Sequence, residues 1–234
     1  MLNRIATQWI ALGGDGRFQG LLALPPAGKG PGLVLFQEIF GVNAHIQGVA
    51  EQYALDGFVV LAPDLFWRSQ PKVELGYEGE ERARGIDLMK KLTGPELEAD
   101  IKSTVDALRA RSETAGRKVG AIGYCLGGRL AYMAAATTQI DAAVAYYGGG
   151  IHDQLDRAAS IECPLQFHYA EQDDNIPLTA VERVRAAMQG KRSEVFIYER
   201  AHHGFNCWDR ASYDPRSAAI AHGRSLQFLG EQLF

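Results

Sequence analysis

The sequence predicts an α/β fold with a mostly parallel central sheet of about eight strands and helices on both faces. Short apolar runs of strand length alternate with segments of helical period, as in successive βαβ units. The later runs are apolar at nearly every position, which is typical of strands covered on both faces. Strands are expected at 8–11, 18–23, 33–36, 59–62, 119–123, 142–146, 165–169 and 195–198.

The first two strands have a different character from the rest. They alternate between polar and apolar residues and are joined by the turn sequence GGDG. This pattern predicts an antiparallel hairpin at one edge of the sheet.

Helix signals fall between the strands. Asn43 is a good N-cap for a helix with apolar positions at helical spacing, and Gly57 ends that run. Pro95 begins a second helix, residues 126–136 form a third, and Asp214 precedes a last one whose leucines, Leu226 and Leu229, are expected to face the core.

The segment 68–92 is charged and less regular. We interpret it as a cap or rim over a cleft. The 234 residues contain no repeat, low-complexity tract or linker, so we expect a single domain spanning residues 1–234.

The bulk composition excludes several classes of protein. A net charge of −4 argues against nucleic-acid binding, and no basic cluster indicates an anionic membrane. No stretch reaches the ~18 apolar residues of a membrane span, and the N-terminus lacks a signal-peptide core. The 3 cysteines are widely spaced and suit a reducing compartment. We therefore expect a cytoplasmic protein, either a monomer or a weak homo-oligomer.

The most informative stretch is KVGAIGYCLGGRLAYMAAA, around Cys125. Gly123-x-Cys125-x-Gly127 lies between a predicted strand and a predicted helix, which is the context of the nucleophile elbow of α/β-hydrolases, here with cysteine in place of serine. The following helix directs its positive end toward the sulfur and favours thiolate. The alternative is a buried cysteine beside glycines that only permit close packing.

In such folds the acid and the histidine follow the nucleophile in that order. The strand PLQFHYA leads into EQDDNIP, which places Asp173 and Asp174 just beyond a strand end, where catalytic groups gather in open α/β sheets. Position alone leaves both open and favours Asp173. The alternative is that both only form the turn and cap the next helix.

The strand VFIYE leads into RAHHGFN, where the base belongs. Adjacent extended residues point to opposite sides, so His202 and His203 cannot both face Cys125, and the pair is a poor metal site. The remaining histidines show no metal-ligand spacing, and His168 alternates as a core residue would. No metal, nucleotide or other cofactor is expected.

These residues predict acyl transfer. Cys125 attacks a carbonyl carbon, the histidine handles protons, and the aspartate orients the imidazole. Two backbone N–H groups are needed for the oxyanion, and the candidates are those of Leu126, after the nucleophile, and Ile39, in the loop QEIFGVN after the third strand.

Four motifs together resemble the dienelactone hydrolases (carboxymethylenebutenolidases): GYCLGG at 123–128, QEIFGVN at 37–43, PDLF at 63–66 and A-x-HGF at 201–205. The resemblance runs over nearly the whole chain, with the motifs in the order and spacing of the family. It implies a single α/β-hydrolase domain that opens a lactone or small carboxylic ester through a thioester.

The resemblance also implies roles for particular residues. The histidine before Gly-Phe is His203, and the acid of the Ala-x-x-Asp turn is Asp173. Glu38 matches a glutamate that contacts the resting thiol and that substrate binding frees to take the thiol proton. The alternative for Glu38 is a solvated loop charge.

The substrate's carboxylate, in this family, is held by two arginines. Arg84 or Arg82 matches the first. At the second position, after the HGF motif, the sequence has Asn206, Cys207 and Trp208, with Arg210 out of register. Trp208 and Phe40 are therefore candidates for the wall of a pocket that accepts a more apolar ester or a larger ring.

Two other readings remain besides a cofactor-independent thiol hydrolase. The first is a redox-reactive or acyl-accepting cysteine on the same fold, which would be oxidised readily by peroxide and would not turn over esters. The second is a non-enzymatic binding domain that inherited the fold.

Overall fold

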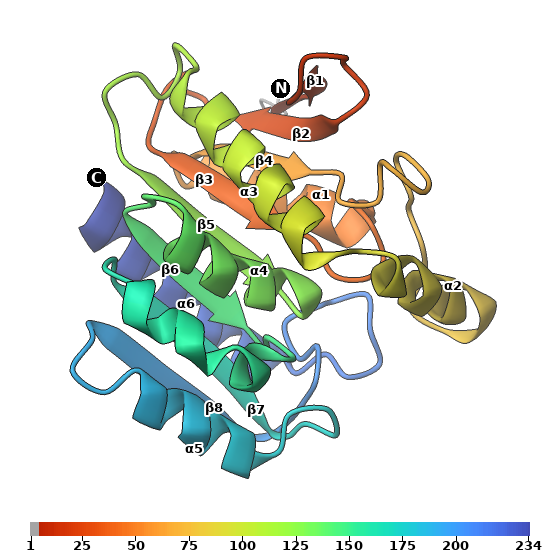
Figure 1. The fold of residues 1–234 in the computed structure, drawn as a ribbon, viewed down its shortest axis with the longest axis vertical. Helices are drawn as coiled ribbons and strands as arrows, with labels where there is room; N and C mark the ends of the chain where they lie inside the picture. The colour runs from red at the N-terminus through yellow and green to blue at the C-terminus, as the bar shows by residue number, and fades with distance from the viewer. Residues whose placement is uncertain (1–4) are drawn as a thin grey trace. The chain divides into compact units, whose positions relative to one another are not determined.

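The computed structural model describes residues 5–234 and confirms the predicted α/β class (Figure 1). Its eight strands form one mostly parallel sheet in the order β1-β2-β4-β3-β5-β6-β7-β8. Their bounds are β1 Ala6–Ala11, β2 Gln19–Leu24, β3 Gly32–Phe36, β4 Val59–Pro63, β5 Val119–Tyr124, β6 Ala142–Tyr146, β7 Leu165–Gln172 and β8 Ser193–His202.

The chain divides into two compact units, Met1–Gly120 and Ala121–Phe234. The expectation of a single domain spanning residues 1–234 stays a prediction.

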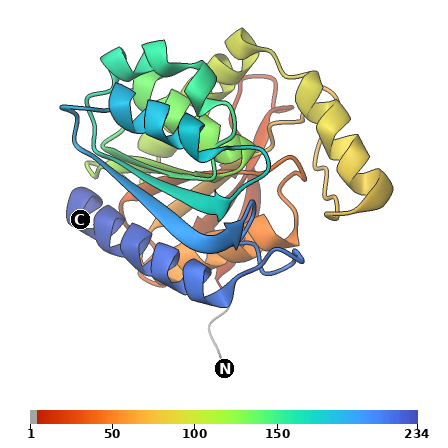
Figure 2. The same ribbon diagram turned by 90° about the horizontal axis from the view of Figure 1, so that it is seen from below.

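The first unit contains the predicted hairpin. β1 pairs antiparallel with β2, β2 pairs antiparallel with β4, and β3 runs parallel to β4. The helices α1 (Ala44–Leu55) and α3 (Gly94–Arg109) lie on opposite faces of these strands (Figure 2). The α1 helix begins as expected, because the side chain of Asn43 accepts the N–H of Ile46 at 3.3 Å and so caps one of the free amides of the first turn.

The segment 68–92 is more ordered than its sequence suggests. It contains the helix α2 (Gly79–Lys90), whose only buried residues are Gly85 and Leu88. With so few apolar positions the segment lacks the periodic signal from which a helix is predicted.

The second unit carries β6, β7 and β8, which run parallel to one another. The helices α4 (Leu126–Thr137) and α5 (Leu178–Ala187) cover one face and α6 (Pro215–Leu233) covers the other (Figure 2). Two short 3₁₀ helices, η1 (Ile151–Asp153) and η2 (Leu155–Ser160), follow β6. In α6, Leu229 is fully buried as expected, but Leu226 is only half-buried.

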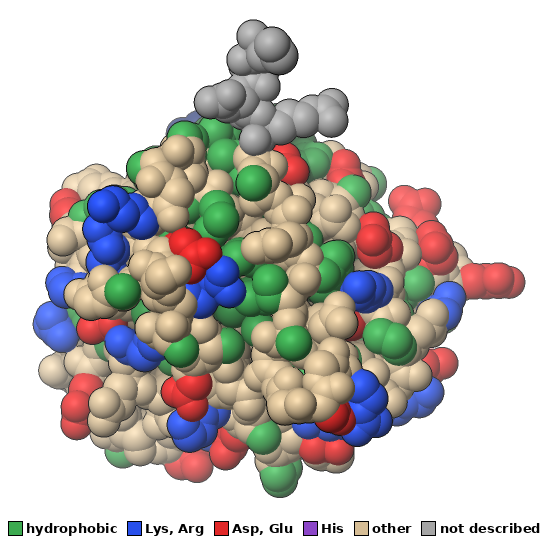
Figure 3. Space-filling model, turned by 90° about the horizontal axis from the view of Figure 1, so that it is seen from above, with side chains coloured by type: hydrophobic (Ala, Val, Ile, Leu, Met, Phe, Trp, Pro, Cys, Tyr) green, Lys and Arg blue, Asp and Glu red, His purple; other side chains and the backbone are tan. Residues whose placement is uncertain are grey.

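The surface agrees with the charge balance of the sequence. On the face drawn in Figure 3, Lys and Arg side chains are interspersed with Asp and Glu rather than gathered into a basic field. Among the residues from 5 onward, no helix combines the length and the apolar character that crossing a bilayer requires.

Candidate active site

A sharp turn carries the chain from the end of β5 through Cys125 into α4. The backbone of Cys125 has φ 55° and ψ −114°, a conformation that a residue with a side chain keeps only where its surroundings enforce it. The flanking glycine allows the turn, because a Cβ at Gly123 would lie 2.0 Å from the carbonyl oxygen of Gly127. No larger residue fits there without moving the backbone.

Contacts with β6 fix the same turn. The N–H of Cys125 donates to the carbonyl oxygen of Tyr146 at 3.0 Å, and a Cβ at Gly128 would lie 2.4 Å from that oxygen. The start of α4 therefore packs directly on the end of β6. Leu126 is the first residue of α4, so its N–H has no acceptor within the helix and is suited to receive an oxyanion.

Asp173 lies just after β7, in the turn that leads to α5. One carboxylate oxygen, Oδ1, accepts the N–H groups of Asn175 at 2.9 Å and Ile176 at 3.2 Å. The other, Oδ2, lies 2.7 Å from Nδ1 of His203. The carboxylate is fully buried, whereas the neighbouring Asp174 is exposed. Asp173 is thus held by its own turn and directed at the histidine.

His203 follows the last residue of β8, and its side chain is largely buried, with a relative exposure of 13%. His202 is the last residue of β8, pairs with Gln172 and is exposed. The two adjacent imidazoles therefore have different environments, as the alternation of extended residues requires. Of the two, it is His203 that meets Asp173.

Electrostatics favour the protonated form of His203. Burial lowers its pKa, but the negative charge of Cys125 and side-chain hydrogen bonds with Asp173 and Cys125 outweigh burial and raise the pKa to about 10. Asp173 is thus hydrogen-bonded to His203, and the charge of Cys125 acts on the same imidazole within the second unit. An imidazolium between a thiolate and a carboxylate is the arrangement of an activated cysteine nucleophile.

One aromatic ring and one serine hydroxyl hold His203 in place. The ring of Tyr147 lies 5.0 Å from that of His203, and the hydroxyl of Ser212 donates to the carbonyl oxygen of His203 at 2.8 Å. Gly204, with φ +82°, has the guanidinium of Arg210 where its Cβ would be, with Nη1 only 2.4 Å from that position. A residue larger than glycine would displace this arginine.

In the first unit, the loop after β3 contains the remaining candidates, Glu38, Ile39 and Phe40. Leu75 donates its N–H to the carbonyl oxygen of Phe40 at 2.9 Å, and Gly41 forms an isolated antiparallel bridge with Glu74. A Cβ at Gly41 would lie 1.7 Å from the carbonyl oxygen of Val73, so this close approach requires glycine. The loop that carries Ile39 is therefore fixed by its neighbour segment.

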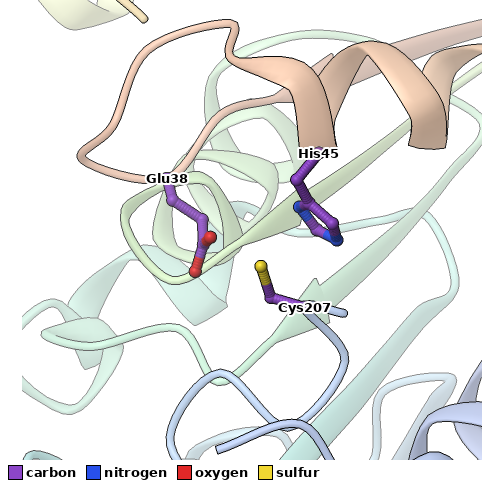
Figure 4. Close-up of side chains that lie close together, drawn as sticks. All are labelled: Glu38, His45 and Cys207. Atoms are coloured by element: carbon purple, nitrogen blue, oxygen red, sulfur yellow. The ribbon is translucent and has the colours of Figure 1, made fainter. Parts of the chain in front are cut away.

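Glu38 is buried, with 1% of its surface exposed, so it is not a solvated loop charge. Figure 4 shows that its carboxylate and the imidazole of His45 point toward one another, and these groups lie within 4.8 Å. Figure 4 also labels Cys207, which belongs to the second unit. Glu38 and His45 supply two potential metal ligands from the first unit.

The candidate substrate-binding residues are dispersed. Arg82 and Arg84 lie on α2 and are exposed, and the guanidinium of Arg84 donates to the side chain of Gln70. Phe40 is buried, with its ring 4.5 Å from that of Tyr77 and nearly edge-on. Trp208, in the second unit, is 43% exposed. Their part in substrate binding stays a prediction.

Two residues near the nucleophile were not singled out from the sequence. Tyr147 contacts His203 with a strained backbone, φ 34°, and Arg129 lies one helical turn after Cys125. Neither a second tyrosine after a strand nor an arginine in a helix carries a sequence signal of its own.

A strand–nucleophile–helix elbow on a mostly parallel eight-stranded sheet, followed in chain order by an aspartate and a histidine, defines an α/β-hydrolase. The comparisons with known proteins agree. The model of the dienelactone hydrolase family matches residues 18–233.

Individual relatives span nearly the same length. Carboxymethylenebutenolidase from Pseudomonas sp. (strain P51) is 35% identical over 217 residues, covering 92% of this chain and 91% of the relative. The enzyme of the same name from Pseudomonas putida is 32% identical over 214 residues, covering 91% and 90%. A solved structure from Klebsiella pneumoniae subsp. pneumoniae MGH 78578, assigned as a dienelactone hydrolase, has a TM-score of 0.87 at 27% identity and covers 97% of this chain and 99% of its own.

The chain belongs to the dienelactone hydrolase family. It is accordingly a hydrolase that acts on esters or lactones.

Proposed function

We propose that the chain opens a lactone or a small carboxylic ester through a Cys125–His203–Asp173 triad and a thioester acyl-enzyme, without a cofactor. The observation that carries this proposal is the contact of 2.7 Å between Oδ2 of Asp173 and Nδ1 of His203, an imidazole on which the charge of Cys125 also acts. The strained elbow that presents Cys125 supports it further.

In the activated state Cys125 is the thiolate and His203 the imidazolium. The sulfur attacks the carbonyl carbon, and the electron pair of the C=O bond moves onto oxygen to give a tetrahedral oxyanion. As the C=O bond re-forms, the C–O bond to the leaving group breaks, and the Nε2–H of His203 protonates the departing oxygen. For a lactone the leaving alcohol stays attached to the acyl group.

The second half of the reaction regenerates the pair. Neutral His203 takes a proton from water as the water oxygen attacks the thioester carbon. The second tetrahedral intermediate then expels the Cys125 thiolate and releases the acid. Throughout, the Asp173 carboxylate keeps Nδ1–H directed at itself, which leaves Nε2 for the reacting atoms and stabilises the cation.

The oxyanion is assigned to the N–H groups of Leu126 and Ile39. Leu126 qualifies as the first amide of α4, and Ile39 as a member of the fixed loop after β3. Each such donor contributes about 3 kcal/mol to stabilising the transition state.

Glu38 is proposed to take the thiol proton when substrate binds, as the resemblance to the family implies. Its burial supports a role in the site rather than on the surface. For the pocket wall we keep Phe40 and Trp208, and for the substrate's carboxylate Arg82 or Arg84.

The test compares wild type with Cys125→Ala on a carboxylated dienelactone and on p-nitrophenyl acetate. We expect turnover of at least one substrate by the wild type and none by Cys125→Ala with an unchanged circular dichroism spectrum. Full activity in a folded Cys125→Ala protein would overturn the mechanism. No turnover of either substrate, with rapid peroxide oxidation of Cys125, would instead favour the alternative of a redox-reactive cysteine on the same fold.

A further inference from the structure

Arg129 lies on α4, four residues and about one helical turn after Cys125. Its guanidinium packs against Gly150, in the glycine run that follows β6. A Cβ at Gly150 would lie 3.0 Å from Nη1 of Arg129, and Gly150 itself has φ +84°. The loop after β6 is therefore shaped to leave room for this side chain beside the elbow.

The guanidinium has no protein partner. In the range 5–234, no residue forms a hydrogen bond or an ion pair with the Arg129 side chain, and its Nε is buried without an acceptor. Other partly buried arginines are paired: Arg68 has two hydrogen bonds to Asp100, at 2.5 and 3.0 Å, and Arg111 donates to Glu113 at 2.6 Å. Arg129 departs from this pattern.

An unsatisfied, half-buried cation is unfavourable in the free protein. Burial lowers the pKa of Arg129, and only the negative charges of Cys125 and Asp153 oppose that effect, both without a hydrogen bond to it. An anion that brought its own oxygens to the guanidinium would remove this penalty. The five N–H donors of arginine fit a carboxylate in a two-point geometry that a lysine does not reproduce.

We propose that Arg129 binds the carboxylate of an anionic ester or lactone while Cys125 attacks its carbonyl, and so selects anionic over uncharged substrates. This inference rests on the proposed function, because it requires the substrate to be placed at Cys125. It makes Arg129, on the helix that begins just after the nucleophile, the specificity residue for the carboxylate in place of Arg82 or Arg84, which are exposed on α2. A purely structural role, as a prop for the Gly148–Gly150 loop, would instead affect anionic and uncharged substrates equally.

The first test does not depend on turnover. Iodoacetate and iodoacetamide alkylate thiolates by the same displacement of iodide and differ in carrying a carboxylate or a neutral amide. The rate ratio of iodoacetate to iodoacetamide at Cys125 is measured by mass spectrometry and referred to the ratio for glutathione in the same buffer. The other cysteines interfere little, because burial raises the pKa of Cys163 to about 11 and Cys207 is fully buried.

We expect the ratio at Cys125 to exceed that of glutathione, and to fall about ten- to a hundredfold in Arg129→Met, the range for a lost hydrogen-bonded charge. The ratio for Arg129→Lys, which keeps the positive charge but not the two-point geometry of the guanidinium, should lie between the ratios for wild type and Arg129→Met. The matched control is Arg185→Met, which removes an equal charge from the exposed face of α5 and should leave the ratio as in wild type. If folded Arg129→Met has the same rate ratio as the wild-type protein, the proposed role of Arg129 is wrong.

The second test uses turnover of two esters with acyl chains of equal length, p-nitrophenyl butyrate and the mono-p-nitrophenyl ester of succinate. Arg129→Met should lower kcat/KM for the succinate ester about tenfold or more relative to the butyrate ester. An equal loss of kcat/KM for both esters in Arg129→Met would instead show that Arg129 only supports the loop structure. If neither ester is turned over while the alkylation ratio still responds to Arg129→Met, the proposed hydrolysis fails and the anion site stands.

Discussion

His203 and Asp173 meet through one oxygen only: Oδ2 of the carboxylate lies 2.7 Å from Nδ1 of His203, while Oδ1 is occupied by two backbone N–H groups of its own turn. The turn thus fixes the carboxylate before the histidine contacts it. Both the orientation and the charge of His203 then depend on Asp173.

Replacing Asp173 with asparagine should therefore lower kcat strongly. The side chain keeps its shape but loses its charge, and it can present an N–H to the imidazole and impose the wrong tautomer. We expect a loss of about 10³–10⁴-fold in ester turnover. Asp174→Asn is the matched control, since that exposed residue should be replaceable without loss. Equal activities of the two variants would contradict the assignment of Asp173.

The proton of His203 should persist well above neutral pH. Burial pushes its pKa down, but Cys125 and Asp173 push it up to about 10, so the imidazolium is retained until the pH approaches that value. Without the thiolate the upward effect shrinks, and in Cys125→Ala the pKa should fall. Long-range ¹H–¹⁵N NMR titration of the imidazole in both proteins measures this, and identical titration curves would exclude the charge pair.

The glycine at the elbow should be far less replaceable than a glycine elsewhere. Gly123→Ala puts a Cβ 2.0 Å from the carbonyl oxygen of Gly127, so the backbone must move, and we expect a loss of about 2–4 kcal/mol in the free energy of unfolding. Gly223→Ala, in the exposed middle of α6 with open space around it, should instead stabilise by about 0.5–1 kcal/mol. Urea unfolding of both variants tests this, and a Gly123→Ala protein as stable as wild type would disprove the constraint.

Acid stability should depend on His168. This residue is fully buried, with Nδ1 2.8 Å from the Tyr198 hydroxyl and Nε2 2.8 Å from Oε1 of Gln166, and burial lowers its pKa from 6.5 to about 3. Between those pH values the unfolded chain binds the proton and the folded chain does not. Stability should therefore fall as the pH drops below 6.5, by about 1.4 kcal/mol per pH unit. In His168→Gln this part of the slope should vanish, and an unaltered slope would assign it to other groups.

The fold could be largely predicted because its signals are local. The hairpin and the buried strands follow from alternation and from short apolar runs. Where burial is small the signal fails: α2 buries only two residues, Gly85 and Leu88, so 68–92 looked irregular. β7 and β8 extend past their apolar stretches to Gln172 and His202 for the same reason, since their final residues are exposed.

The candidate site was predictable where backbone geometry restricts the sequence. The elbow needs glycine on both sides of Cys125, and chain order then leads to an aspartate and a histidine. Choosing His203 over His202 from the residues alone was not possible, because alternation shows that one faces away without saying which. Arg129 could not be identified, because the absence of a counter-ion is a property of the folded neighbourhood and not of a motif.

At the elbow, the shape of the turn and the identity of the reacting atom depend on different parts of Cys125. The main chain determines the turn, and the side chain supplies the reacting atom. The shape of the turn depends on close approach between backbone atoms of Gly123 and Gly127, and on the bond from the Cys125 amide to Tyr146. The sulfur takes no part in either. The reacting atom is therefore exchangeable: a serine at position 125 should occupy the same strained turn, and this scaffold can host oxygen as well as sulfur nucleophiles.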